Sequence, residues 1–134
     1  MSRENVEAVK RSFELWSDGS TGEWIETLDP DIEWDVSAHP LPDFPNRGSG
    51  RDAFLRHLGD YISGWNDYEV SSRELIDAGD EVVLILHERA RMRDSDMMLD
   101  RDLPTVWTVR DGRIVRHRVF KTRAEALEAA GLEE

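Results

Sequence analysis

The sequence predicts an α+β fold, in which helices come first and a curved antiparallel or mixed sheet follows. Apolar residues recur at helical spacing in the first 30 residues and again over 52–64. From residue 68 onward, consecutive strand-like segments are separated by short turns. The expected order is α-α-β-α-β-β-β-β-α, which differs from the regular alternation of α/β proteins. N-terminal helices that cover a strongly curved sheet leave a cone with one open end.

Each expected helix has an apolar stripe or a recognisable end. The first begins near Ser2, stops at Asp18-Gly19 and has on one face Val6, Val9, Phe13 and Trp16. The short second helix ends at Asp29-Pro30, because the residue before a proline is pushed out of the α region. The third helix, over 52–64, has the stripe Phe54, Leu58, Tyr61 and Ile62. A last helix is expected over 124–130, closed by Gly131.

The expected strands cover 31–36, 68–78, 81–93, a segment ending at Arg110, and 113–121. The run Val82 to Leu86 is apolar throughout, which is typical of a strand buried on both faces. Asp111-Gly112 is a two-residue hairpin signal, because both positions tolerate the positive φ of a type I′ turn. Residues 37–50 contain three prolines and no period, so we expect a loop long enough to form the rim of a site.

Length and composition limit the class of protein. The 134 residues suit one domain, 1–134, with one substantial core. The formal charge of −12 argues against binding to nucleic acid or anionic membranes, both of which attract basic surfaces. No apolar run approaches the roughly 20 residues that cross a bilayer. The N-terminal residues lack the apolar core of a signal peptide, and there is no cysteine; both features suit a cytoplasmic protein.

Four segments, in this order, resemble the nuclear-transport-factor-2-like superfamily and within it the SnoaL-like group: Trp24 to Trp34, Arg47-Gly48, Val106 to Val115, and Arg123 to Leu132. Together they extend over nearly the whole chain. The resemblance implies the cone fold. It does not imply one function, since the superfamily includes isomerases, polyketide cyclases, epoxide hydrolases, dehydratases and non-catalytic binding modules.

Two activities of the superfamily fit the sequence poorly. The position of the isomerase base falls on Val36, and Asp35 beside it is expected on the opposite face of its strand unless a β-bulge reverses it. The isomerase oxyanion-hole positions fall near Ser12 and Thr105, where such enzymes have Tyr and Asp. The epoxide hydrolase reading needs an Asp-Arg-Asp set, and Arg89 has no acid beside it on its own face.

The histidines are the better catalytic candidates. His117 alternates with Val115 and Val119 in the last strand, so we expect its ring to point inward, where an imidazole can act as general acid or base. His87 follows Val83 and Ile85 with the same parity, and Arg89 comes next on that face. The candidate catalytic residues are therefore His117, His87 and Arg89. The alternative for both histidines is a core residue that has a fixed hydrogen bond and no chemistry, since burial alone commonly explains such residues.

Cyclases of the SnoaL-like group are expected to pair an acid with a histidine. No inward carboxylate stands beside His117 in the last two strands, which leaves Asp102, or Asp43 and His39 from the loop, as partners. His57 is taken as a surface residue. A metal site made of His87, His117 and a carboxylate lacks any short-range ligand spacing, so neither a metal nor a cofactor is expected.

Five tryptophans in a chain of this length indicate either a dense core or an aromatic-lined cavity. The candidate ligand-binding residues are Trp16, Trp34, Phe54, Trp65 and Trp107, with an apolar small molecule as the expected partner. Three functions stay open: a small-molecule enzyme, a non-catalytic ligand carrier, and a module that dimerises through the outer face of the sheet. The resemblance favours a homodimer, and Arg110, Arg116 and Arg118 on that face would suit a polar interface.

Overall fold

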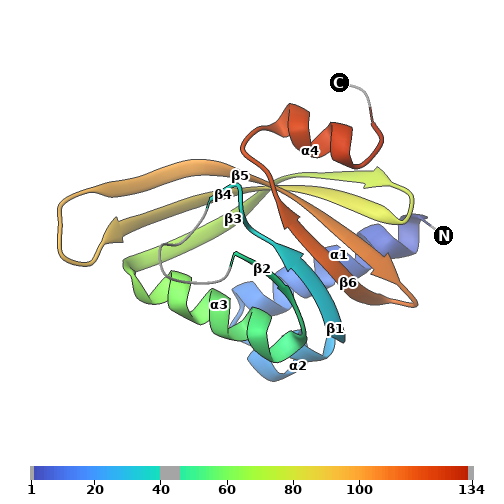
Figure 1. The fold of residues 1–134 in the computed structure, drawn as a ribbon, viewed down its shortest axis with the longest axis horizontal. Helices are drawn as coiled ribbons and strands as arrows, with labels where there is room; N and C mark the ends of the chain where they lie inside the picture. Colours follow the sequence, from blue (N-terminus) through green and yellow to red (C-terminus); the bar gives the residue numbers. More distant parts are fainter. Residues whose placement is uncertain (1, 40–45, 133–134) are drawn as a thin grey trace.

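The computed structural model describes residues 2–39 and 46–132. Within these two ranges, four helices and six strands follow one another (Figure 1). In chain order they are α1 (Ser2–Ser17), α2 (Thr21–Glu26), β1 (Leu28–Asp35), β2 (Arg47–Ser49), α3 (Arg51–Ser63), β3 (Trp65–Ala78), β4 (Glu81–Met92), β5 (Met98–Arg110), β6 (Arg113–Val119) and α4 (Arg123–Ala129).

All six strands form one open sheet in the order β2-β1-β6-β5-β4-β3. The pair β1–β6 is parallel and the other pairs are antiparallel, so the sheet is mixed. Figure 1 shows α1, α2 and α3 on one side of the twisted sheet and α4 on the other side. The α+β class and the helix-covered, curved sheet expected from the sequence are confirmed.

Strand β4 is buried on both faces. Val82, Leu84 and Leu86 belong to the apolar cluster that contains Val9 of α1. The alternate residues Val83 and Ile85 pack instead with residues of α4, Ala126 and Leu127. The run Val82 to Leu86 is continuously apolar because each of its faces meets a different helix. The face toward α1 is called the inner face below, and the face toward α4 the outer face.

The β5–β6 hairpin sets the register at the centre of the sheet. Asp111 and Gly112 have φ values of 52° and 78°, as the predicted type I′ turn requires. The pairing shifts between Thr108 and Val109, so that a β-bulge falls at Val115. A bulge reverses the alternation. Val115 therefore lies with charged residues on the outer face, and its predicted place on the face of His117 is wrong.

The expected strand bounds 31–36 and 113–121 differ from those of β1 and β6, and three other elements differ more in kind or position. The short strand β2 was not predicted, because a three-residue segment with a glycine at its centre has no periodicity. Helix α2 ends at Glu26, before Asp29-Pro30, and Pro30 lies inside β1 where the pairing with β6 is irregular. Strand β3 already begins at Trp65. Within residues 2–39 and 46–132, no helix is long and apolar enough to cross a membrane.

Candidate functional site

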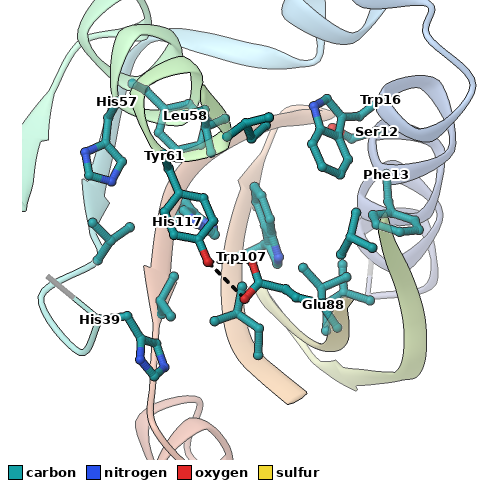
Figure 2. Close-up of a pocket in the computed structure, with 18 of the residues that line it drawn as sticks. Ser12, Phe13, Trp16, His39, His57, Leu58, Tyr61, Glu88, Trp107 and His117 are labelled. Atoms are coloured by element: carbon teal, nitrogen blue, oxygen red, sulfur yellow. Dashed lines mark hydrogen bonds between the residues drawn. The ribbon is translucent and has the colours of Figure 1, made fainter. Parts of the chain in front are cut away.

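A cavity lies between the inner face of the sheet and the helices α1, α2 and α3 (Figure 2). Its empty space, the open mouth included, is about 910 Å³. Most of its wall is apolar or aromatic: Val9, Phe13, Trp16, Trp24, Val36, Phe54, Leu58, Ile62, Val70, Leu84, Leu86, Leu103, Trp107, Ile114 and Val119. Its polar wall residues are Ser12, His39, His57, Tyr61, Tyr68, Glu88, Arg101 and His117.

His117 of β6 is a buried wall residue with a neutral ring. Only 6% of the residue is exposed. Burial, with a smaller contribution from His57, lowers the pKa of His117 to about 3. Among the described residues, none accepts from or donates to its buried Nδ1. The imidazole is therefore uncharged near neutral pH and retains hydrogen-bonding capacity that the protein itself does not use.

Aromatic neighbours hold the His117 ring in place. The Trp107 ring centroid lies 4.0 Å from that of His117, and the Phe54 centroid lies at 5.4 Å. Trp107 is itself fixed, because its Nε1 donates to Thr105 Oγ1 at 2.8 Å and Thr105 donates to the Leu84 carbonyl at 2.6 Å. Trp107 stands opposite His117 in the pairing of β5 with β6, and the two hydrogen bonds through Thr105 keep its indole in that position.

A second polar group in the cavity surrounds Glu88 of β4, which is 0% exposed. Tyr61 Oη donates to both carboxylate oxygens, at 3.0 and 3.1 Å, and Tyr68 Oη donates to Oε1. Arg101 donates from Nε to Oε2 at 3.0 Å. Figure 2 shows the Tyr61 hydroxyl directed at the Glu88 carboxylate. A buried carboxylate is stable only when it is paired and hydrogen-bonded, and this one is both.

The same group fixes the protonation of its members. Burial, followed by the charge of Glu88, raises the pKa of both Tyr61 and Tyr68, so their hydroxyls stay protonated as donors. Burial alone would lower the pKa of Arg101, but Tyr61 and Glu88 together raise it, so the guanidinium stays charged. Burial, followed by the neighbouring Arg101, lowers the pKa of His39. The group thus contains one anion and one cation.

The SnoaL-like domain model matches residues 9–117, most of the chain. The protein belongs to the SnoaL-like family. Solved structures agree on the fold. A nuclear-transport-factor-2-like protein of unknown function from Burkholderia pseudomallei is 19% identical, with 96% of this chain and 97% of that chain covered and a TM-score of 0.74.

Two further structures are similar over most of their length. TerC, co-crystallised with polyporic acid, is 20% identical, with 96% of this chain and 98% of that chain covered and a TM-score of 0.73. A proposed polyketide cyclase from Sinorhizobium meliloti is 24% identical, with coverages of 84% and 93% and a TM-score of 0.66. No curated protein sequence matches the chain significantly. Identities this low establish the SnoaL-like fold alone.

Of the three candidate catalytic residues, only His117 lines the cavity of this SnoaL-like protein. His87 has the predicted parity with Val83 and Ile85, but these residues face α4 on the outer side. There His87 lies between two carboxylates, with Nδ1 2.7 Å from Asp102 and Nε2 2.6 Å from Asp100. The exposed Arg89 pairs weakly with Asp100 at 3.7 Å. The expected inward direction of His87 and Arg89 is therefore wrong.

Of the five candidate ligand-binding residues, Trp16, Phe54 and Trp107 line the cavity. Trp34 is buried in the core, where its ring centroid lies 5.1 Å from that of His57. Trp65 begins β3 and lies against Tyr61 at 6.4 Å. Neither Trp34 nor Trp65 is a wall residue.

The loop and the third helix bring in two histidines. His57 is 7% exposed and lines the cavity, so its prediction as a surface residue is wrong. His39 also lines the cavity, and Arg101 Nη1 lies 3.1 Å from its Nδ1. Asp102, considered as a partner of His117, is bound to His87 on the outer face. Asp43 lies outside the described residues.

The positions of the superfamily isomerase site carry different chemistry here. Val36 lines the cavity, whereas Asp35 is bound to Ser37 and Arg47 outside it. Partial burial opposes ionisation of Asp35, but hydrogen bonds from Ser37 prevail and lower its pKa. The irregular pairing of β1 with β6 lies between Leu28 and Glu33, so no bulge at Asp35 turns it inward. Ser12 reaches the cavity and its hydroxyl is 2.7 Å from that of Thr27.

The carboxylate that the sequence reading lacked is Glu88. It shares the inner face with Leu84 and Leu86, where an acid interrupts an otherwise apolar alternation. An acid in line with buried positions is itself a signal, since Glu is almost never fully buried without partners. The sequence parity places Val83, Ile85 and His87 on the inner face and therefore predicts Glu88 on the outer face, which is wrong.

Proposed function

We propose that the cavity binds an apolar small molecule built on one or more rings, and that His117 exchanges a proton with it. The observation that carries this proposal is an aromatic-walled cavity containing a neutral, buried imidazole with an unused Nδ1. The chemistry would be of the cyclase or isomerase kind, without a cofactor.

Aromatic walls favour a flat, ring-containing ligand. Trp16 of α1 and Trp107 of β5 both line the cavity (Figure 2). Aromatic pairs prefer offset-stacked or edge-to-face contacts, which a rigid ring system can make without losing conformational freedom. The name of one structural neighbour, a proposed polyketide cyclase, is consistent with a cyclic substrate.

The low pKa of His117 restricts how it would act. A neutral imidazole is ready to accept a proton at neutral pH, but the imidazolium it forms is disfavoured by the same burial. An enolising substrate offsets that cost, because it gains a negative charge as the proton leaves. His117 would then act as the general base toward a carbon next to a carbonyl, and would return the proton as general acid.

A non-catalytic ligand carrier is the second candidate, and one observation favours it. Both Glu88 oxygens are already hydrogen-bonded by Tyr61, Tyr68 and Arg101, so this carboxylate is not free to orient His117. A histidine without an acidic partner is a weaker catalyst than the paired histidine of a catalytic dyad. The same cavity would then hold its ligand without transforming it.

Binding is tested first, with naphthalene as the probe. A ligand that binds only the folded state, at 100 times its Kd, stabilises that state by about 2.7 kcal/mol. We expect naphthalene to raise the melting temperature of the wild type and of Leu55→Trp, but not of Leu58→Trp. Leu58 lines the cavity and Leu55 of the same helix does not, so the two exchanges are matched. No response of the wild type would overturn the proposed pocket.

Proton transfer is tested with 5-nitrobenzisoxazole, a flat bicyclic probe whose ring opens when a base removes one carbon-bound proton. We expect turnover above the buffer rate in the wild type, loss of that turnover in His117→Leu and retention in His87→Leu. His87 is a matched control because it lies on the outer face. Binding with equal turnover in the wild type and His117→Leu would exclude His117 as the base and favour the carrier.

A further inference from the structure

The guanidinium of Arg101 is held at the cavity wall by three separate elements. Its Nε donates to Glu88 on β4, its Nη2 donates to Tyr61 Oη on α3 at 3.0 Å, and its Nη1 donates to His39 Nδ1 in the loop after β1. Three fixed hydrogen bonds leave a planar fork little freedom to turn. Arg101 is therefore preorganised before any ligand arrives.

Two of its donors remain available. A guanidinium has five N–H groups, and within the described part of the chain Arg101 uses three of them. One N–H remains on each terminal nitrogen. The Arg101 side chain is 32% exposed while the Glu88 side chain is 0% exposed, so Arg101 is the member of the pair that a ligand can reach. Such donors at an apolar wall suit an oxygen acceptor on a bound molecule.

The balance of charge selects the kind of oxygen. Glu88 and Arg101 are the only acidic or arginine side chains among the described wall residues, and their charges cancel. His39 and His117 both have lowered pKa values and add no positive charge near neutral pH. The protein as a whole carries −12. At Arg101, a carboxylate would lose its hydration and meet a guanidinium whose charge Glu88 already balances.

We infer that Arg101 is a specificity-determining residue, which binds an uncharged carbonyl or hydroxyl oxygen of the ligand through its two unused N–H groups. The substrate class is then a neutral oxygenated ring compound, such as a ketone, quinone or phenol, and carboxylic acids are rejected. Glu88 and Tyr61 act through Arg101, as positioning residues. This inference rests on the proposed function, since it names the polar end of the ligand of the same cavity.

Three naphthalene derivatives of nearly equal shape test the inference on the wild-type protein. They are 2-isopropenylnaphthalene, 2-acetylnaphthalene and 2-naphthoate, which carry C=CH₂, C=O and a carboxylate at the same position. Hydrogen bonds to charged groups contribute about 1.5–3 kcal/mol, so we expect the ketone to bind at least about tenfold more tightly than the hydrocarbon in calorimetric titration. We expect 2-naphthoate to bind more weakly than the ketone.

The outcomes separate this inference from the proposed function. Equal affinity for the ketone and the hydrocarbon overturns the role of Arg101 but leaves the proposed pocket intact. Binding of 2-naphthoate more tightly than the ketone has the same consequence. Absence of binding by all three compounds overturns both proposals.

Variants test whether the preference for the ketone over the hydrocarbon comes from Arg101. We expect Arg101→Met to bind the ketone and the hydrocarbon equally, whereas the control Arg89→Met, with its side chain on the outer face, keeps the wild-type ratio. The double variant Glu88→Gln with Arg101→Met repeats the test without a buried unpaired carboxylate, in case the single variant folds poorly. A wild-type ratio in either Arg101 variant overturns the inference.

Discussion

Replacing Arg101 with methionine would leave the Glu88 carboxylate buried and without its countercharge. Glu88 is 0% exposed, and Arg101 supplies its one charged hydrogen bond among the described residues. Breaking a buried ion pair by removing one partner costs about 3–5 kcal/mol. Because about a third of the Arg101 side chain is exposed, water already weakens the attraction, and we expect a loss near the lower end, about 3 kcal/mol.

The assay is urea unfolding followed by tryptophan fluorescence, at pH 7. In a thermal melt of a chain of this size, a loss of about 3 kcal/mol in the free energy of unfolding lowers the melting temperature by roughly 10 °C. Arg89→Met is the matched control, since Arg89 is mostly exposed and its 3.7 Å pair with Asp100 is worth at most about 1 kcal/mol. The double variant Glu88→Gln with Arg101→Met should recover at least half of the loss, because no unpaired charge remains.

Two results would refute this reasoning. The free energy of unfolding of Arg101→Met could lie within about 0.5 kcal/mol of that of the wild type. In that case the buried Glu88 carboxylate does not need Arg101 as its countercharge. If the double variant is as unstable as the single one, the loss comes from packing of the long Arg101 side chain and not from the isolated carboxylate.

Three further predictions concern other parts of the molecule. Below the ordinary histidine pKa of 6.5, the unfolded His117 binds a proton that the folded one, with its pKa of about 3, excludes. Stability should therefore fall as the pH falls, by up to about 1.4 kcal/mol per pH unit, and His117→Leu should remove this part of the slope in urea titrations at pH 7, 6 and 5. Gly48→Ala would place a Cβ 2.9 Å from the Trp34 ring and should lower the free energy of unfolding by about 1–3 kcal/mol. Gly59→Ala, whose Cβ would meet nothing within 4 Å, should leave stability unchanged or raise it, and equal effects of the two exchanges would contradict the packing at Trp34. We expect sedimentation velocity to show a homodimer that forms through the outer sheet face. Salt and the exchange Arg116→Glu should both weaken this dimer, and a monomer at high protein concentration would contradict the proposal.

The fold was readable from the sequence because its signals are local and repeated. The stripe on α3 and the Asp111-Gly112 turn each depend on residues a few positions apart, and both are found in the structure. The turn alone would place Trp107 opposite Arg116, and the β-bulge at Val115 shifts the register so that Trp107 pairs with His117. The bulge at Val115 left no such local sign, because a β-bulge depends on the partner strand.

The rest of the site depends on which face of β4 is inner, and the sequence alone does not decide this. Val82 to Leu86 is apolar at every position, so neither parity is marked. Helix α4, which comes last in the chain, covers the outer face and buries the residues that precede His87. Once that face is assigned, Glu88 becomes the inner residue. Its partners come from α3 and from the two flanking strands β3 and β5, and Arg101 stands directly opposite Glu88 in the pairing of β4 with β5.

The most direct test of the account is the nitrogen NMR spectrum of the four histidine rings, with His117→Gln used to assign the His117 signals. The account predicts that the His117 ring stays uncharged down to at least pH 5 and that its nitrogen signals shift when naphthalene is added. A His117 ring that titrates near pH 6.5 and does not respond to naphthalene would mean that it faces water, and that the cavity is not a binding site built around it.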